Sequence, residues 1–384
     1  MKADEKLRSL YLHIPFCVRK CSYCDFYSIS SAKAEIMEQY AARLCEVIRQ
    51  WGTELGHISL ETVYIGGGTP SLLSEQSMDA ILTATGEAFS LDAQTEISME
   101  ANPATMSLEK ARAFRASGIG RISLGVQSFQ PEELQTMGRL HGVREVLETV
   151  DCIRQAGFTN YNLDLIYGVP GQTLISWEQS LHQALELSPT HLSLYLLQMD
   201  ERVPLARRIE RGELSEPEED SVVEMFYRSD ELLREKGYTH YEISNFARAG
   251  YECRHNLEYW KSHPYLGLGA GAVSYLEGCR FKLSPDVRHF LAKDSEPALG
   301  RGEILEEMTT PQERLADALV MGLRCMRGVD TEELTERFGI DPMKHYEREI
   351  AECTEAGLLT AAGNFLRLTR KGWFLSNQVF WRFL

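Results

Sequence analysis

The feature that most constrains the fold is a regular alternation of short β-rich runs with segments of helical periodicity. Six runs rich in β-branched and aromatic residues occupy the first 200 positions: SLYLHI from Ser9, TVYIGGG from Thr62, TEISMEAN from Thr95, RISLGVQSF from Arg121, YNLDLIYG from Tyr161 and HLSLYLL from His191. Most are separated by segments in which apolar residues recur three and four positions apart, at 35–51, 107–118, 143–157 and 175–187. A strand followed by a helix, repeated in this way, indicates parallel strands with crossover helices.

The predicted fold is an α/β partial (β/α)6 barrel of the TIM type, and a doubly wound open sheet is the alternative. Six units are two fewer than a closed TIM barrel needs. Unusual residues favour the barrel because they fall at or just past the C-terminal ends of the strands, where such folds build their sites. These residues are Cys17, Gly66 to Thr69, Glu100 with Asn102, Gln127 and Asp164.

The sequence pattern divides the chain into three parts. Residues 1–200 are predicted to form the partial barrel, and residues 201–308 a connector with a long helix from about Glu218 to Lys236 that completes the core. Residues 309–384 are predicted to form a helical, winged-helix-like domain with three helices, a strand pair around GLLTAAGNFLRLT and a final helix. This last segment has ten Lys/Arg against eleven Asp/Glu, so its charge favours a structural or docking domain over a DNA-binding one.

Charge and hydropathy narrow the class of protein. The 384-residue chain carries a net charge of −16, which repels polyanions, so nucleic acid is not an expected partner. No apolar run reaches the roughly 18 residues that a membrane-spanning helix needs, and MKADEKLRSLYLH has no apolar stretch of signal-peptide length. We therefore expect a cytoplasmic protein, in which the nine cysteines are metal ligands or buried thiols.

Three cysteines, Cys17, Cys21 and Cys24, lie close together directly after the first predicted strand. A structural zinc site usually has four protein ligands, so three thiolates without a near fourth ligand would be incomplete. A cubane iron-sulfur cluster fits better, because three cysteines leave one iron open to an exchangeable ligand. His13 is close in sequence but lies in the strand pattern, where packing under the loop is the favoured role.

The spacing C-x-x-x-C-x-x-C at the end of the first strand of a partial α/β barrel resembles the radical S-adenosylmethionine (SAM) superfamily, over about residues 9–200. In that family, SAM chelates the open iron through the amino and carboxylate groups of its methionine portion. The resemblance therefore implies a [4Fe-4S] cluster on Cys17, Cys21 and Cys24, with SAM as the second cofactor.

Five further motifs resemble one subgroup, the oxygen-independent coproporphyrinogen III dehydrogenases and their relatives: HIPFC, GGGTPS, GVQSF, LGRLH and DLIYGVPGQT. The resemblance spans nearly the whole chain. Carried over by position, it implies SAM contacts from Tyr11, Gly67, Gly68, Thr69, Glu100, Gln127, Arg139 and Asp164. The chemistry suits these roles, since carboxylates accept hydrogen bonds from ribose hydroxyls or an ammonium group and an arginine pairs with a carboxylate.

Two departures separate the chain from the dehydrogenases. They carry a further cysteine where this sequence has Phe26, and they have a longer segment than the sixteen residues that precede Cys17 here. The stretch HNLEYW at 255–260 instead resembles an element of the HemW-type heme chaperones, which bind heme for delivery to acceptor proteins. The resemblance implies that His255 binds heme iron, with Cys253 and His263 as competing axial ligands.

The resulting hypothesis is a heme chaperone, not an enzyme, that holds a SAM-liganded [4Fe-4S] cluster and binds heme within the region 201–308. Its expected partners are heme and a heme-accepting protein, with a membrane respiratory enzyme as one candidate, and a homodimer is left open. The alternative is a radical SAM oxidoreductase that acts on coproporphyrinogen III or another substrate through a 5′-deoxyadenosyl radical. A winged-helix nucleic-acid binder with a cluster sensor is a third hypothesis, which the charge disfavours.

Overall fold

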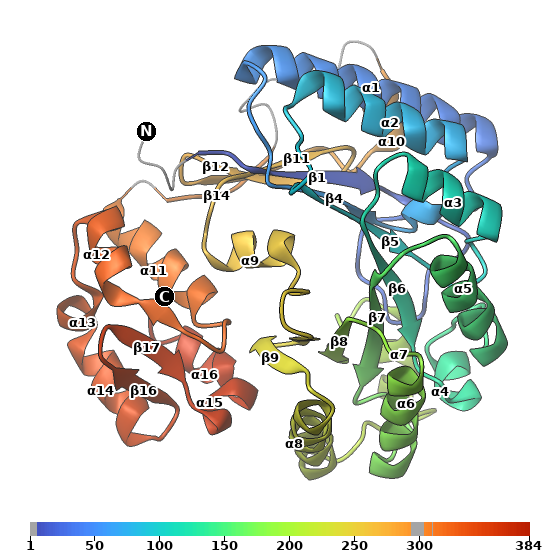
Figure 1. Ribbon diagram of the computed structural model, residues 1–384. Helices are drawn as coiled ribbons and strands as arrows, with labels where there is room; N and C mark the ends of the chain where they lie inside the picture. Colours follow the sequence, from blue (N-terminus) through green and yellow to red (C-terminus); the bar gives the residue numbers. More distant parts are fainter. Residues whose placement is uncertain (1–5, 293–302, 309) are drawn as a thin grey trace.

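The computed structural model describes residues 6–292, 303–308 and 310–384 of the chain (Figure 1). Residues 1–5, which belong to the stretch expected to lack a signal peptide, lie outside the described residues. So does Thr309, the first residue of the predicted C-terminal domain.

Six parallel strands follow one another in chain order and form the centre of the sheet. They are β1 (Ser9–Ile14), β4 (Thr62–Gly67), β5 (Glu96–Ala101), β6 (Arg121–Gln127), β7 (Asn160–Tyr167) and β8 (His191–Leu196). Each agrees with a predicted β-rich run to within one or two residues. The crossover helices are α1 (Ala34–Leu55), α2 (Glu75–Ala88), α3 (Leu108–Ala116), α4 (Pro131–Thr136), α5 (Val143–Gln155) and α6 (Leu174–Glu186).

The two faces of this sheet differ in polarity. On β4, Val63 and Ile65 are fully buried in the main hydrophobic core, where Trp51 of α1 and Trp177 of α6 also lie. Thr62 and Tyr64 alternate with them and make polar contacts with side chains of neighbouring strands on the other face. The crossover helices cover the apolar face (Figure 1), so the sheet has one helical layer. The partial α/β barrel is thus confirmed over the doubly wound alternative, and the barrel is not closed.

The sheet is longer than six strands. β11 (Tyr265–Leu268) runs parallel to β1 on its free side, and β12 (Val273–Leu276), β13 (Cys279–Lys282) and β14 (Glu303–Glu307) continue antiparallel from it. At the other edge, β10 (Asn245–Ala247) and β9 (Thr239–Glu242) follow β8 in antiparallel order. The sequence pattern did not predict this seventh parallel strand, since β11 lies in the glycine-rich stretch YLGLGAGAVSY.

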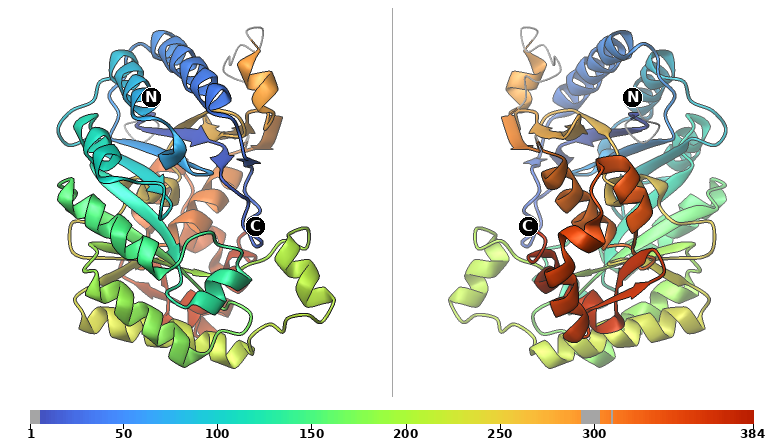
Figure 2. Two further views of the ribbon diagram at one scale, coloured as in Figure 1. Left: turned by 90° about the vertical axis from the view of Figure 1, so that its right-hand side faces the viewer. Right: turned by 90° about the vertical axis from the view of Figure 1, so that its left-hand side faces the viewer.

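Between β8 and β11 the chain forms three helices. α7 (Pro204–Glu210) stands out from the rest of the molecule as the yellow-green helix in Figure 2, α8 (Glu219–Glu235) packs beside α6, and the short α9 (Arg254–Trp260) contacts β4. After β13 comes α10 (Val287–Leu291), which packs on α1. α8 matches the long helix predicted from about residue 218 to 236.

The C-terminal segment is mainly helical and has a hydrophobic core of its own that includes Leu319, Leu366 and Val379. Its elements are α11 (Pro311–Gly322), β15 (Val329–Asp330), α12 (Thr331–Phe338), α13 (Pro342–His345), α14 (Glu347–Glu355), β16 (Leu359–Ala362), β17 (Phe365–Leu368), α15 (Arg370–Phe374) and α16 (Ser376–Phe380). The predicted strand pair is the β16–β17 hairpin. Among the described residues, no helix combines the length and apolarity that crossing a membrane requires.

Candidate functional site

A cavity of about 500 Å³ opens at the carboxyl ends of the parallel strands. All three cysteines of the motif line it, and so do seven of the residues expected to contact SAM. The seven are Gly67, Gly68, Thr69, Glu100, Gln127, Arg139 and Asp164. These ten residues, up to 147 positions apart in sequence, share one cavity because parallel strands end at the same edge of a sheet.

The cysteine loop is held at both ends by backbone contacts. Its first cysteine ends β2 (Phe16–Cys17), which pairs with β3 (Ile29–Ser30). In the middle of the loop, Ser22 donates its N–H to Met137 O and its hydroxyl to Thr136 O, at 3.1 and 3.0 Å. The loop is thereby tied to the end of α4, which places the thiols over the cavity.

The three thiols suit a cluster better than a single metal ion. All three are free and partly exposed. Within the described part of the chain, no three His, Cys, Asp or Glu side chains come close enough to hold one ion. A cubane cluster is a larger object that takes each cysteine sulfur on a different iron. Three free thiols around one cavity therefore fit a [4Fe-4S] cluster. Phe26, which is 69% exposed, also lines this cavity, at the position where the dehydrogenases carry a further cysteine.

The glycine turn after β4 brings its backbone against the start of the cysteine loop. Gly67 has φ of +118°, and a Cβ atom on it would lie 2.7 Å from the His13 ring. A Cβ on Gly68 would lie 2.6 Å from the backbone oxygen of Phe16, the residue before Cys17. A side chain on Gly67 would clash with His13 of β1, and one on Gly68 would clash with the start of the cysteine loop. The turn therefore requires glycine for close approach as well as for conformation.

Arg139 connects the cysteine loop to the strand ends. Its Nη1 lies 3.3 Å from Cys21 Sγ, and its Nη2 donates to Asn102 Oδ1 and Gly125 O at 2.8 and 2.7 Å. Asn102 in turn donates to Thr69 Oγ1 at 2.8 Å. The guanidinium group is a fixed positive charge beside the thiols, where it can pair with a carboxylate group of a ligand.

Two partly buried carboxyl groups line the cavity. Glu100 accepts hydrogen bonds from Gly67 N–H and Tyr64 O–H, at 3.0 and 3.1 Å, while Asp164 accepts from Asn162 Nδ2 at 2.7 Å. Burial, followed by repulsion from Asp164, raises the pKa of Glu100 to about 7. Burial also raises the pKa of Asp164. Such carboxyl groups are suited to the hydroxyl and ammonium groups of a polar, cationic ligand.

The backbone at Gln127 has an uncommon conformation that directs its side chain toward the cavity. It has φ of +70°, a conformation that non-glycine residues adopt rarely, and it lies at an irregularity in the pairing of β6 with β7. This bulge turns the end of β6 so that the Gln127 side chain faces the cavity. Positive φ at a side-chain position costs on the order of 1 kcal/mol or more, which such a function would justify.

Tyr11 is the one predicted SAM residue that the structure does not place among the residues lining this cavity. Its hydroxyl group bonds His13 Nδ1 at 3.0 Å, and its ring stacks on Tyr64 with centroids 6.3 Å apart. Tyr64 donates to Glu100, so Tyr11 reaches the site through one intervening residue.

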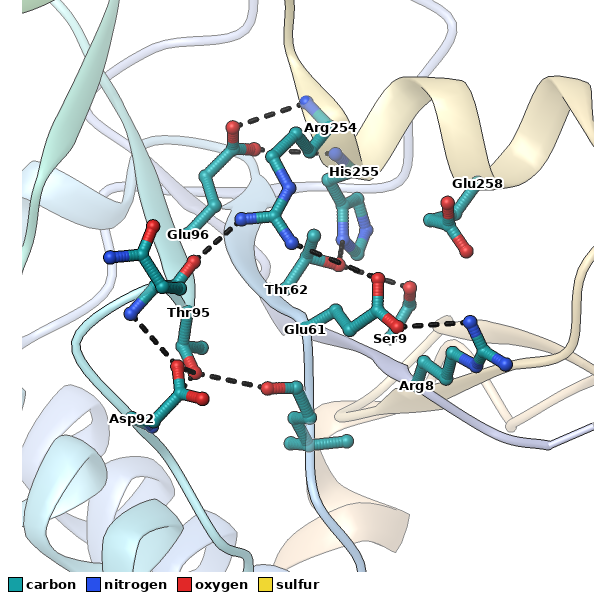
Figure 3. Close-up of polar contacts among 12 residues, drawn as sticks. Arg8, Ser9, Glu61, Thr62, Asp92, Thr95, Glu96, Arg254, His255 and Glu258 are labelled. Atoms are coloured by element: carbon teal, nitrogen blue, oxygen red, sulfur yellow. Dashed lines mark hydrogen bonds and ion pairs between the residues drawn. The ribbon is translucent and has the colours of Figure 1, made fainter.

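His255 lies at the opposite end of the strands from the cysteines. Its Nδ1 bonds Thr62 Oγ1 at the start of β4, at 2.7 Å (Figure 3). Its Nε2 bonds Tyr259 O–H at 2.8 Å. The ring stacks on Tyr64 and the residue is 1% exposed. Burial lowers its pKa to about 3. Both ring nitrogens are therefore occupied, and coordination of heme iron by His255 would require one of these bonds to open.

The alternative heme ligands are also engaged. Cys253 is fully buried, and burial raises its thiol pKa to about 12. His263 Nδ1 lies 2.8 Å from Glu258 Oε2. The α9 segment is thus packed against the N-terminal ends of the strands. Glu96 accepts hydrogen bonds from the backbone N–H groups of Arg254 and His255 (Figure 3).

Several cavity residues were not among the predicted SAM contacts. Asn102 is a predicted strand-end residue and Tyr23 belongs to the cysteine motif, but neither has a predicted contact with SAM; Ser123 and Tyr195 have no predicted role. Ser123 could have been found from strand alternation, because it lies on β6 two positions from Arg121 and Gly125 and faces the same way as Glu100, its partner on β5. Tyr195 is 41% exposed on β8 and gives the cavity an aromatic wall.

Comparison with known proteins agrees with this geometry. Residues 11–184 match the Radical SAM superfamily, and residues 309–375 match the HemN C-terminal domain. The chain is 37% identical to "Heme chaperone HemW" of Lactococcus lactis, covering 99% of this chain and 98% of that protein. It is 33% identical to the protein of the same name from Bacillus subtilis, with 98% and 99% covered, and 39% identical to that of Escherichia coli, with 73% and 74% covered.

Among solved structures, coproporphyrinogen III oxidase (HemN) from Escherichia coli, a radical SAM enzyme, superimposes with a TM-score of 0.85. The superposition covers 100% of this chain and 91% of that one at 23% identity, so it shows the fold. Radical SAM membership implies a [4Fe-4S] cluster and SAM. The chain belongs to the radical SAM superfamily and, within it, to the family of proteins that carry the name heme chaperone HemW.

Proposed function

We propose that this protein binds heme, holds a SAM-liganded [4Fe-4S] cluster and transfers the heme to acceptor proteins. The observation that carries the proposal is the similarity to HemW heme chaperones over nearly the full length of both chains. The cavity supports the cofactor half of it, because free thiols, a fixed guanidinium group and two carboxyl groups line one space. The proposed partner is a protein that lacks heme and accepts it.

We assign the cluster to Cys17, Cys21 and Cys24. When bound, the cluster would supply an iron with an open coordination position and a centre for electron transfer. Arg139 would hold the ligand carboxylate beside Cys21, and the backbone of Gly67 and Gly68 would let the ligand approach closely.

The remaining assignments concern the rest of SAM. Glu100 and Asp164 would accept hydrogen bonds from its ammonium and ribose groups, while Gln127 and Thr69 complete the polar lining. Tyr11 would act on SAM indirectly, because its ring stacks on Tyr64 and Tyr64 donates a hydrogen bond to Glu100.

His255 remains the proposed heme ligand, and its geometry sets a condition on that role. The imidazole must give up Thr62 or Tyr259 before a ring nitrogen can reach iron. His255 and Tyr259 lie one turn apart on the same helix, so a movement of α9 would carry both residues and break the bond from Nδ1 to Thr62 of β4.

A second candidate function is oxidation of coproporphyrinogen III or a related substrate by a 5′-deoxyadenosyl radical. The observation that favours it is that the three cysteines and seven of the expected SAM residues line one cavity, on a fold shared with the enzyme HemN. Phe26 argues against it, because it replaces the further cysteine of the dehydrogenases in the cavity wall.

One sample distinguishes the two functions. The full chain is reconstituted with iron and sulfide without oxygen, and heme is titrated in while the Soret band is recorded. A parallel portion is supplied with SAM, reductant and coproporphyrinogen III, and protoporphyrinogen is measured. Saturable heme binding without turnover supports the chaperone. Turnover of the porphyrinogen, or the absence of any heme spectrum, would refute it.

A further inference from the structure

An unbroken line of hydrogen bonds joins the cavity to the first turn of α9. Asp164 Oδ1 lies 2.7 Å from Asn162 Nδ2, and Asn162 Oδ1 lies 2.7 Å from His191 Nδ1. His191 Nε2 lies 2.8 Å from the Tyr241 hydroxyl, which is 3.1 Å from the backbone nitrogen of Cys253. These five residues form the Asp164–Cys253 line, which crosses from β7 to β8 and on to the N-cap of α9.

Chemistry fixes the direction of every bond in this line. An ionised Asp164 can only accept, so the Asn162 amide nitrogen donates to it and the Asn162 carbonyl oxygen is left to accept from His191 Nδ1. A neutral imidazole that donates at Nδ1 accepts at Nε2, so the Tyr241 hydroxyl donates to it. The Cys253 backbone N–H in turn donates to the Tyr241 oxygen. All four bonds therefore point toward the carboxyl group of Asp164.

Burial makes this line sensitive to the state of Asp164. Asn162, His191 and Cys253 are at most 1% exposed, so water does not compete for their hydrogen bonds. Burial lowers the pKa of His191 well below its ordinary value, in agreement with the neutral ring. Hydrogen bonds that all run the same way polarise one another, and an ionised acceptor at the end strengthens each of them.

The line ends where α9 begins, next to the proposed heme residue. Cys253 is the N-cap of α9, and His255 lies two residues later. On the other side, Glu96 accepts the N–H groups of Arg254 and His255 at 3.1 and 3.2 Å. Figure 3 shows this second attachment, and Tyr241 supplies the first. The position of α9 thus depends on contacts that trace back to the cavity.

We propose that His191 and Tyr241 are positioning residues that couple ligand binding at Asp164 to the stability of the first turn of α9. The inference deepens the proposed function, because SAM is the ligand assigned to Asp164. A cationic ligand whose hydroxyl groups bond Asp164 favours the ionised carboxylate, which strengthens the line and holds α9 in place. Neither residue touches the ligand.

The test measures backbone amide exchange in the cluster-loaded full chain, with and without SAM and with no reductant. SAM is expected to slow exchange of the Cys253 amide and its α9 neighbours by about fivefold or more in the wild-type protein. Tyr241→Phe keeps the ring and removes the hydroxyl group. It is expected to bind SAM within a few-fold of wild type and to show the same α9 exchange with and without SAM.

A matched control is Tyr238→Phe, which removes another buried tyrosine hydroxyl group in the same segment, one that donates to Pro189 O. The slowing by SAM should persist in this variant. Equal slowing in Tyr241→Phe and wild type would overturn the proposal, as would a wild-type protein whose α9 exchange ignores SAM or that binds no SAM. Heme does not enter the experiment, so a chain that binds SAM but no heme refutes the chaperone function without deciding this result.

Discussion

Arg139 places its guanidinium Nη1 3.3 Å from the sulfur of Cys21 and its Nη2 2.8 Å from the amide oxygen of Asn102. One side chain thus joins the cysteine loop to the end of β5. Because the thiols are proposed cluster ligands, the same charge is proposed to pair with the carboxylate of SAM. The structural contact and the proposed ligand contact of Arg139 can be separated by experiment.

Replacement of Arg139 by a neutral residue is predicted to weaken the binding of SAM more than it lowers the cluster content. Arg139→Met keeps the length of the side chain and loses the ion pair, so SAM affinity should fall roughly tenfold or more, as for a lost charged hydrogen bond. Iron and sulfide content should stay close to wild type. Equilibrium dialysis and iron analysis measure the two quantities. Arg144→Met, at a side chain 79% exposed, is the control, and equal loss of SAM in both variants would contradict the assignment.

The glycine turn gives a prediction about stability. Gly68→Ala puts a Cβ atom 2.6 Å from Phe16 O, so the free energy of unfolding should fall by about 1–3 kcal/mol and cluster yield should drop. Gly86→Ala, in α2 with nothing within 4 Å of the new Cβ, should raise it by about 0.5–1 kcal/mol. Urea unfolding measures both. An unchanged Gly68→Ala protein would show that the turn can move freely.

The raised pKa of Glu100 predicts that the free energy of unfolding depends on pH. Its pKa is raised from 4.5 to about 7, so the folded state holds its proton more tightly than the unfolded state. The contribution is full below about pH 4.5 and is lost as pH rises toward about 7. It amounts to about 3 kcal/mol for a shift of this size. In urea unfolding of the cluster-free protein, Glu100→Gln should show a smaller fall across this interval. A fall equal to that of wild type would contradict the assignment.

The contacts of His255 predict opposite effects for two neighbouring substitutions. Tyr259→Phe frees Nε2 and keeps an aromatic ring, so heme affinity should rise roughly twofold to tenfold, the value of one hydrogen bond. His255→Ala removes the proposed ligand and should abolish the axial-ligand spectrum. Heme titration followed by absorbance measures both variants. Wild-type affinity in His255→Ala would place the heme ligand elsewhere.

The parallel strands could be predicted because each is a local pattern. β1, β4, β6 and β8 begin at the residues where their runs begin, since β-branched residues alternate there and glycine or polar turns interrupt them. β11 was not predicted because Gly267 within it and the glycines that follow it weaken the strand pattern. Gly267 is needed there because a Cβ atom would lie 2.0 Å from Val273 O, a contact between segments that the sequence does not display.

Part of the candidate site could likewise be predicted from the sequence, and part could not. Cys17 and Glu100 lie at strand ends, so topology alone brought them together. The surroundings of His255 could not be predicted, because Thr62 and Tyr64 approach it from a strand 191 or more residues away in sequence. A histidine beside aromatic residues looks the same in sequence whether it faces a ligand or is buried with both nitrogens bonded.

The most direct test of the proposed function is heme transfer. The cluster-loaded, SAM-bound chain is loaded with heme, freed of excess heme by gel filtration and mixed with an apo-cytochrome b, while the Soret bands of donor and acceptor are followed. The account predicts that the acceptor spectrum grows as the donor spectrum declines, in equal amounts. Heme that stays on the chain, or that reaches the acceptor no faster than free heme released by dilution, would contradict it.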